Sequence, residues 1–202
     1  GNVTVQCSGD VPAPANLGWT DNCDGSGTVL SSDGPLVGGN CGGTITRTWT
    51  YTDACGNTAT ANQTITINDT QAPVLAAAPA NISVQCPGDV PAATSLGWTD
   101  NCDGSGTVLS SDGPLVGGNC GGTITRTWTY TDACGNVATA TQTITIDDTT
   151  PPTASAPAPI SVAGGTAPPA DITLITDEAD NCGVPTVAWV GDLSDGGNCP
   201  ET

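Results

Sequence analysis

The sequence runs Thr44-Ile-Thr-Arg-Thr-Trp-Thr-Tyr-Thr52 and places a threonine at every second position. The residues between the threonines are mainly apolar, which is the period of a β-strand with one apolar face. Residues 53–57, Asp-Ala-Cys-Gly-Asn, supply turn formers, and residues 58–67 alternate again. The stretch therefore predicts a β-hairpin.

The hairpin belongs to a longer unit that occurs twice. Residues 17–57 recur without a substitution as residues 96–136, and the flanking residues match more loosely. A diverged third copy begins near Pro152 and stops at Thr202 before its closing strands, so we expect the chain to be cut from a longer protein. Units of this length are complete domains rather than solenoid turns. We place the repeats at residues 1–71, 72–150 and 151–202.

The other segments of each repeat also indicate β-structure. Residues 2–7, 17–20 and 28–32 predict short strands, and no window of helical spacing competes with them. Gly and Pro interrupt the chain at intervals typical of a sandwich. The fold class expected is all-β, with one β-sandwich per repeat arranged as beads on a string. Prolines in the segments 68–73 and 147–152 would stiffen the joints between the beads.

The composition excludes several classes of function. The chain has no His, two Lys and Arg residues in total, 20 acidic residues and a net charge of -18. Nucleic acid is excluded as a partner because phosphate binding needs clustered cations. No apolar run is long enough to span a bilayer, so we expect no direct membrane insertion by this segment, and its first residues carry no export leader. Ten Cys without His indicate disulfides and hence an extracellular or cell-surface location.

The same composition argues against catalysis. Without His or Lys, Ser and Cys nucleophiles lack their usual bases. Paired carboxylates can cleave glycosides, but here the acidic residues lie in turn-rich loops that are copied in each repeat. We therefore expect no enzyme.

Four cysteines in each complete repeat allow three pairings, and the sequence leaves the choice open. The expected strand order places Cys7 and Cys41 at one end of the sandwich and Cys23 and Cys55 at the other. This order favours the pairs Cys7–Cys41 and Cys23–Cys55, repeated as Cys86–Cys120 and Cys102–Cys134. The third copy favours Cys23–Cys41 instead, because it keeps Cys182 and Cys199 but has Gly164 where Cys86 would align.

Acidic residues gather in the loops that should meet at the joints. In the expected sandwich, Asp69 of one linker faces Asp100 and Asp132 of the next repeat. Several converging carboxylates would suit Ca²⁺, which takes six to eight oxygen ligands. The alternative is that these residues are turn formers exposed to solvent. The candidate calcium ligands are Asp69, Asp100, Asp103, Asp132, Asn136, Asp147, Asp148 and Asp180, and no other cofactor is expected.

The threonines of the hairpin would form one hydroxyl-bearing face of a sheet. Such a face could bind a glycan or ice. The alternative is that threonine, a good strand former, simply lies on the solvent side. Replacing Thr46 and Thr60 by Lys would separate the two hypotheses, because only a binding face should lose its ligand.

Three motifs carry a resemblance to a known family. They are Thr-Trp-Thr-Tyr-Thr-Asp-Ala-Cys-Gly-Asn at 48–57 and 127–136, Trp-Thr-Asp-Asn-Cys at 19–23 and 98–102, and Asp-Thr-x-x-Pro at 69–73 and 148–152. These motifs resemble the hyaline-repeat (HYR-like) family of immunoglobulin-like domains, and in particular the repeats of very long surface and gliding-motility adhesins of Bacteroidota. The resemblance implies disulfide-linked, Ig-like β-sandwich beads outside the cell.

The function implied is structural and adhesive, as a stalk or fibre of a long bacterial surface protein. Its partner would be a surface or glycan receptor that the sequence does not identify. Two alternatives stay open. One is a self-assembling extracellular filament, in which copies associate into fibres. The other is a glycan- or ice-binding module that uses the threonine face.

Overall fold

A computed structural model describes residues 1–155, 169 and 171–188 of the 202-residue chain. These residues fall into two compact units. The first comprises Gly1–Ala80, Ala92–Gly113 and Thr125–Gln142, and the second Asn81–Pro91, Pro114–Ile124 and Thr143–Thr202. The residues where the first two repeats meet therefore belong to the first unit. Gly164 and Cys199 lie outside the described residues.

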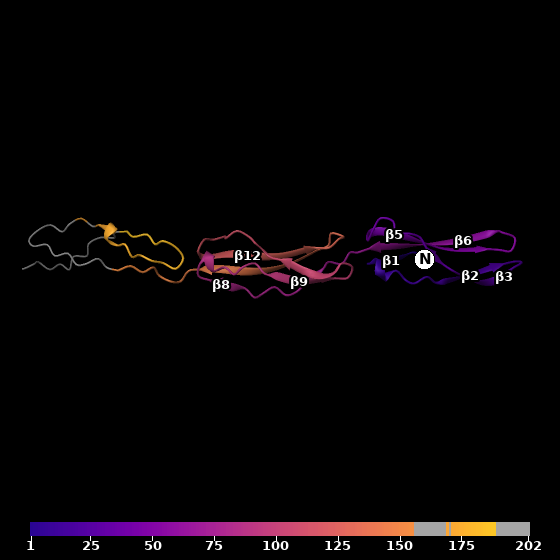
Figure 1. Cartoon of the computed structure of the whole chain (residues 1–202), viewed down its shortest axis with the longest axis horizontal. Coiled ribbons are helices and arrows are strands. Elements are labelled where there is room, and N and C mark those ends of the chain that lie inside the picture. The colour runs from indigo at the N-terminus through magenta and orange to yellow at the C-terminus, as the bar shows by residue number, and fades with distance from the viewer. Residues whose placement is uncertain (156–168, 170, 189–202) are drawn as a thin grey trace, which may run out of the picture. The chain divides into compact units, whose positions relative to one another are not determined.

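The first repeat is built from two small sheets (Figure 1). The larger has four strands in the order β1-β6-β5-β4, and β1 runs parallel to β6. The smaller is the antiparallel hairpin of β2 and β3. The bounds are β1 Val3–Val5, β2 Asn16–Asp21, β3 Gly25–Leu30, β4 Ser32–Asp33, β5 Cys41–Thr52 and β6 Thr58–Asn68.

The predicted hairpin is confirmed as β5 and β6, the two longest strands of the repeat. Their register pairs Thr52 with Thr58 and continues to Gly43 opposite Ile67. Gly56 in the connecting turn has φ of 89°, a conformation that costs glycine no steric strain. The cross-strand pairs include four of threonine with threonine, and Thr46 and Thr60 are exposed. The hydroxyl-bearing face therefore lies opposite the core, and its binding role stays a prediction.

The second repeat has the same strands with one addition. The order β11-β12-β13-β8 matches the first repeat, whereas β9 pairs both with β10 and with a linker strand, β7. The bounds are β7 Val74–Leu75, β8 Ile82–Val84, β9 Ser95–Asp100, β10 Gly104–Leu109, β11 Ser111–Asp112, β12 Cys120–Thr131 and β13 Val137–Asp147. Helical structure among the described residues is limited to three short 3₁₀ turns, Ser8–Asp10, Pro87–Asp89 and Ile172–Leu174. The chain is all-β with Ig-like repeats, as predicted.

The core is small, and aromatic stacking joins the two sheets. Ile65 and Ile67 are fully buried in the first repeat. Trp19 of β2 stacks on Tyr51 of β5, with ring centroids 3.6 Å apart and planes 13° apart. Gly27 of β3 lies under this indole, and a Cβ there would come within 2.7 Å of the ring. The stack therefore needs glycine on the neighbouring strand.

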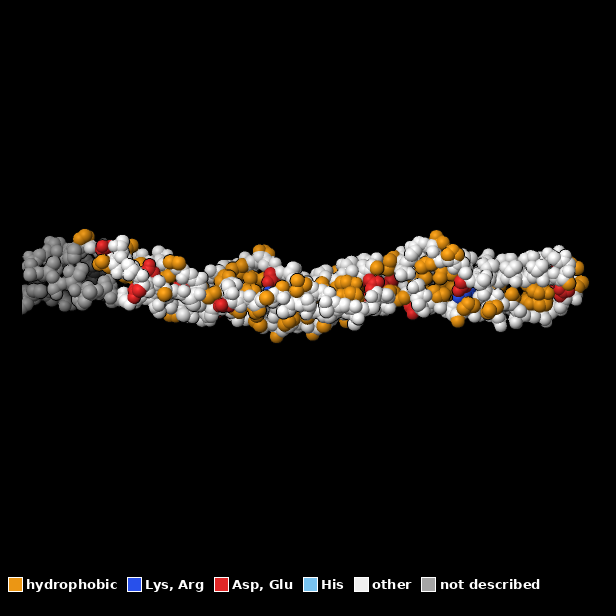
Figure 2. All heavy atoms as spheres, viewed as in Figure 1, with side chains coloured by type: hydrophobic (Ala, Val, Ile, Leu, Met, Phe, Trp, Pro, Cys, Tyr) orange, Lys and Arg blue, Asp and Glu red, His pale blue; other side chains and the backbone are white. Residues whose placement is uncertain are grey.

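Each complete repeat also buries its only arginine. Arg47 is 3% exposed and forms an ion pair with Asp33 at 2.6 Å, while its other donors bind the carbonyl oxygens of Pro12 and Ala13. The hydrogen bond from Arg47 holds the pKa of Asp33 below its usual range. Arg126 and Asp112 repeat the pair. On the face shown in Figure 2, the small blue area lies beside red, in keeping with cations that are already paired.

Candidate functional site: the joint between repeats

Among the described residues, three disulfides connect one repeat to the next. Cys7 bonds to Cys102, and Cys41 bonds to Cys134, so two bonds cross from the first repeat to the second. The third links Cys86 of the second repeat to Cys182 of the third. Each joint is therefore a covalent junction in addition to the peptide linker.

The predicted pairings within a repeat are wrong. Cys7 does not bond to Cys41, nor Cys102 to Cys134, and the alternative Cys23–Cys41 does not form either. Cys7 and Cys41 do lie at a common end, because both reach the second repeat. The error was to close each repeat on itself, although an equivalent cysteine of the neighbour lies within 5.3 Å between Cα atoms.

The corresponding pairs of the second copy are corrected in the same way. Cys86 bonds to Cys182 rather than to Cys120, and Cys120 has no sulfur partner in the part of the chain that the structure describes. Cys182 therefore needs no partner within its own repeat. The third repeat has glycine at position 164, where Cys86 would align, but the bond of Cys182 does not depend on that position.

The linker adds a strand to the repeat that follows it. Val74 and Leu75 of β7 pair antiparallel with Thr99 and Trp98 of β9, and the Ala76 N–H donates to the Gly97 carbonyl at 2.8 Å. This is β-augmentation, in which backbone hydrogen bonds extend a sheet at its open edge. The sequence prediction missed β7 because two residues in an Ala- and Pro-rich segment give no periodic signal. The Val-Leu pair between prolines is the signal that could have indicated it.

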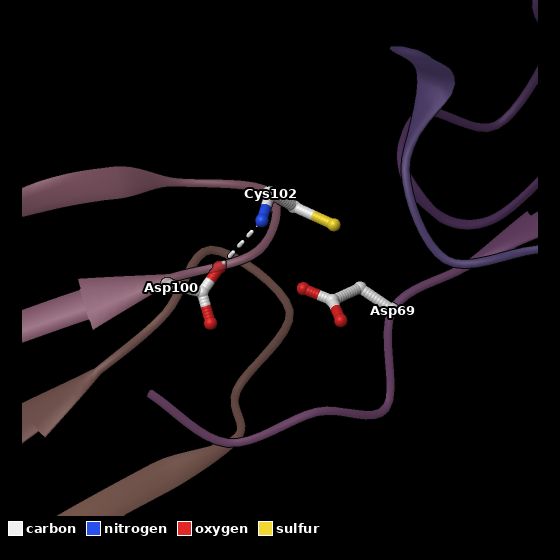
Figure 3. A group of neighbouring side chains, drawn as sticks. All are labelled: Asp69, Asp100 and Cys102. Carbon is white, nitrogen blue, oxygen red and sulfur yellow. Dashed lines mark hydrogen bonds between the residues drawn. The ribbon is translucent and has the colours of Figure 1, made fainter. Parts of the chain in front are cut away.

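Two of the predicted acidic residues meet at the first joint. Asp69, directly after β6, and Asp100, at the end of β9, point toward each other (Figure 3). A carboxylate oxygen of each and the Cys102 sulfur lie within 4.8 Å of one another. Asp69 is 5% exposed, and one oxygen of each carboxylate is buried without a hydrogen-bond partner among the described residues. The sulfur is no thiolate, because it forms the bond to Cys7.

Neighbouring amides hold this arrangement in place. The Asn101 side chain donates to Asp69 Oδ1 at 3.3 Å, and the Asn136 side chain donates to the Asp69 backbone carbonyl at 3.2 Å. Asp100 Oδ1 accepts from the N–H groups of Cys102 and Asp103, each at 2.8 Å. Each carboxylate therefore has one occupied oxygen and one that lacks a partner.

Other candidate ligands have local structural roles. Asp132 is buried, and its oxygens accept from Cys134 and from the backbone and side chain of Asn136. Asp103 Oδ2 accepts from the Ala133 N–H at 2.7 Å, which fastens the hairpin turn. Asp147 is exposed at the end of β13 and is outside the two acidic groups that the described residues form.

The turn carboxylates of both repeats have lowered pKa values. In the first repeat, the side chain and backbone of Asn57 hold the pKa of Asp53 below its ordinary value. Burial opposes ionisation of Asp132, but hydrogen bonds from Asn136, Cys134 and Gly135 outweigh it and lower its pKa as well. Both turns are therefore built around ionised carboxylates.

The second joint, within the second unit, repeats the features of the first. Thr153 pairs with Ala179 through an isolated bridge, in the place that Val74 and Thr99 occupy at the first joint. Asp148 and Asp180 lie within 4.8 Å of each other, beside the sulfur of Cys182. They line a hollow of about 350 Å³. The disulfide, the added pairing and the acidic pair are thus a recurring set.

At the end of the first repeat that bears Cys23 and Cys55, the described residues form no disulfide and add no strand to β2 and β3. Both cysteines are exposed and unbonded, although their counterparts Cys102 and Cys134 are in disulfides. Leu17 is 42% exposed, whereas the identical position in the second repeat, Leu96, is 8% exposed. The identical segments therefore differ in what packs against them.

Comparison with known proteins agrees with these features. A family model described as an HYR-like domain with 4 cysteines matches residues 1–67 and again residues 74–146, which is well over half of the chain. No curated protein matches the sequence. The two matches coincide with the two complete sandwiches, each with four cysteines. The chain therefore belongs to the family of HYR-like domains with four cysteines.

Proposed function

We propose that this chain is a load-bearing stalk segment of an extracellular adhesion protein. HYR-like repeats are non-catalytic, adhesion-type domains, and their cysteine content is that of proteins in oxidising surroundings. None of the helical segments in the described part of the chain is long and apolar enough to cross a membrane. The location and partners of the parent protein, including a bacterial surface and its receptor, are part of this proposal.

The observation that carries the proposal is that a disulfide crosses each of the two joints. A tensile load on a tandem array normally passes through the peptide linkers and unravels one domain after another. Here the bonds from Cys7 to Cys102 and from Cys86 to Cys182 offer a second covalent route. From Gly1 the route reaches Cys7, crosses to Cys102, returns to Cys86 and crosses to Cys182. Most of the chain lies outside this route and is protected from extension.

Force spectroscopy on the 202-residue chain, pulled from its two termini, tests the proposal. The fully stretched length follows the number of residues in the loaded route, at about 3.5 Å for each residue. Oxidised chains should therefore extend to roughly a fifth of the length that reduced chains reach. Equal extension with and without reductant would contradict a load-bearing role for the disulfides.

A further inference from the structure

We propose that the end of the first repeat marked by Cys23 and Cys55 is an acceptor site for another repeat of this family. The repeat that docks there would supply a two-residue apolar linker strand and two cysteines. The inference rests on the serial coupling proposed above and extends it to a surface that is open in this structure.

The first step of the argument is the open edge of β2. In the second repeat, β7 occupies the edge of β9 at Trp98 and Thr99. The matching residues of the first repeat are Trp19 and Thr20, and β2 pairs only with β3 among the described strands. An unpaired strand edge is a template for another strand.

The second step is an apolar groove beside that edge. Its volume is about 240 Å³. Trp49, which lines the groove, is half-buried, whereas its counterpart Trp128 is fully buried. Leu17, which also lines the groove, differs from its counterpart in the same way, because it is 42% exposed whereas Leu96 is 8% exposed. The larger apolar and aromatic side chains of the groove are Leu17, Trp19, Val29, Trp49 and Tyr51, and Thr60 also lines it.

The third step is the two thiols. Cys102 and Cys134 show where cysteines at these loop positions bond, because both reach cysteines of the preceding repeat. Cys23 and Cys55 occupy the same positions in identical loops. Each bond would form by exchange with a small-molecule disulfide, which takes up two electrons and two protons and leaves as two thiols. The incoming cysteines correspond to Cys7 and Cys41.

An extended chain tests the inference directly. A second copy of residues 1–79 fused before Gly1 places the added copy in the register of the natural repeat. The added copy carries Cys23→Ser and Cys55→Ser, so that its own outer thiols are absent. After refolding in oxidised and reduced glutathione, the free thiol count should be two lower than that of the parent chain. A count two higher would overturn the inference.

A second variant separates bonds across the joint from bonds within a repeat. When the added copy also carries Cys7→Ser, bonding across the joint leaves the original Cys23 free to alkylate. Bonding within repeats would instead leave the added Cys41 free, and peptide mapping distinguishes the two. Label on the added Cys41, or a covalent dimer joined through Cys55, would contradict the acceptor site. The parent bond Cys7–Cys102 in the same map reports separately on the proposed serial coupling.

A different observation supports a second inference: we propose that each joint holds one calcium ion between its paired carboxylates. Asp69 and Asp100 carry like charges, with carboxylate oxygens within 4.8 Å, and each has a buried oxygen without a partner among the described residues. Asp69 is buried and Asp100 is partly buried, and two carboxylates at this distance repel each other unless a cation lies between them. The sulfur beside them is in a disulfide, so only oxygens remain as ligands.

The chemistry of the pair selects a hard cation. Carboxylate oxygens with water and backbone carbonyls are the ligands of Ca²⁺, whereas Zn²⁺ and Cu⁺ prefer nitrogen and sulfur. Asp148 and Asp180 repeat the pair beside a hollow that could admit water ligands. We expect one ion at each joint.

Calorimetric titration of the full chain with CaCl₂ tests this second inference. Two ions should bind, with dissociation constants on the order of 10⁻⁴ to 10⁻³ M, the range of extracellular calcium modules. Asp69→Asn should remove one ion, and Asp148→Asn the other. Asp147→Asn is the matched control, because it removes an adjacent exposed charge and recreates the Asn68 of the first joint. The absence of saturable binding, or equal loss in the control, would overturn the site.

Discussion

The two copies of the segment 17–57 and 96–136 have the same sequence but different surroundings. Leu17 is 42% exposed and Leu96 is 8% exposed, while Cys55 is a thiol and Cys134 is in a disulfide. Because no substitution separates the two segments, the difference comes from the residues around them, which in the second repeat include the linker strand β7 paired with β9. Part of the hydrophobic core of a repeat is therefore completed by its neighbour.

The largest effect on stability is expected from removing the two disulfides that join the first repeat to the second. Cys7→Ser combined with Cys41→Ser should lower the free energy of unfolding by about 4 kcal/mol for each bond, since each closes a loop of more than 90 residues. Guanidinium unfolding of the oxidised chain measures the loss. The matched control, Cys23→Ser with Cys55→Ser, removes unbonded thiols and should leave stability unchanged. Destabilisation in the control would contradict the comparison.

The buried arginines should give equal effects in the two copies. Arg47→Met leaves Asp33 and two carbonyl groups without their donor, at a cost of about 3 kcal/mol. Arg126→Met should cost the same within about 0.5 kcal/mol, because the pair it forms with Asp112 has the same 2.6 Å geometry. Thermal unfolding of both variants checks this expectation. A large difference would mean that the effect of the joint extends beyond the residues it covers.

The leucines should respond unequally. Leu96→Ala removes a buried side chain and should cost about 2 to 3 kcal/mol. Leu17→Ala removes a side chain that is nearly half exposed and should cost less than about 1 kcal/mol. Chemical denaturation of the two variants gives the difference. Equal costs would show that the neighbour does not complete the core.

The turn carboxylates allow a smaller test by pH. Asp53 and Asp132 both have lowered pKa values when folded, so each contributes stability above its unfolded pKa of about 3.9. That contribution is lost as the pH falls through the lower, folded value. Carboxyl NMR titration should place both groups below 3.9. A value above 3.9 for Asp132 would mean that burial at the joint outweighs its hydrogen bonds.

The smallest effect is expected on the threonine face. Thr46→Lys and Thr60→Lys alter exposed side chains on the sheet face opposite the core. Stability should change by less than about 0.5 kcal/mol, and the disulfide map should stay the same. Loss of binding to an immobilised glycan, or of ice-growth inhibition, would support the alternative binding function of this face.

The sequence alone predicted those parts of the fold that depend on local periodicity. The threonine alternation fixed β5 and β6, and the strand order predicted that Asp69 would approach Asp100. The disulfides were not predictable in the same way. In a tandem array Cys7 can pair either with Cys41 of its own repeat or with Cys102 of the next. The spacing of the cysteines in the sequence is the same for pairing within a repeat and for pairing between repeats. What separates them is the pairing of one repeat with the next, including that of β7 with β9, which local periodicity does not encode.

The most direct test of the joint is a disulfide map of the oxidised 202-residue chain, obtained by peptide mass spectrometry without reduction. We expect cross-linked peptides that contain Cys7 with Cys102, Cys41 with Cys134, and Cys86 with Cys182, while Cys23 and Cys55 carry the alkylating label. Recovery of Cys7 with Cys41 and of Cys23 with Cys55 would contradict the account, because each repeat would then be closed on itself.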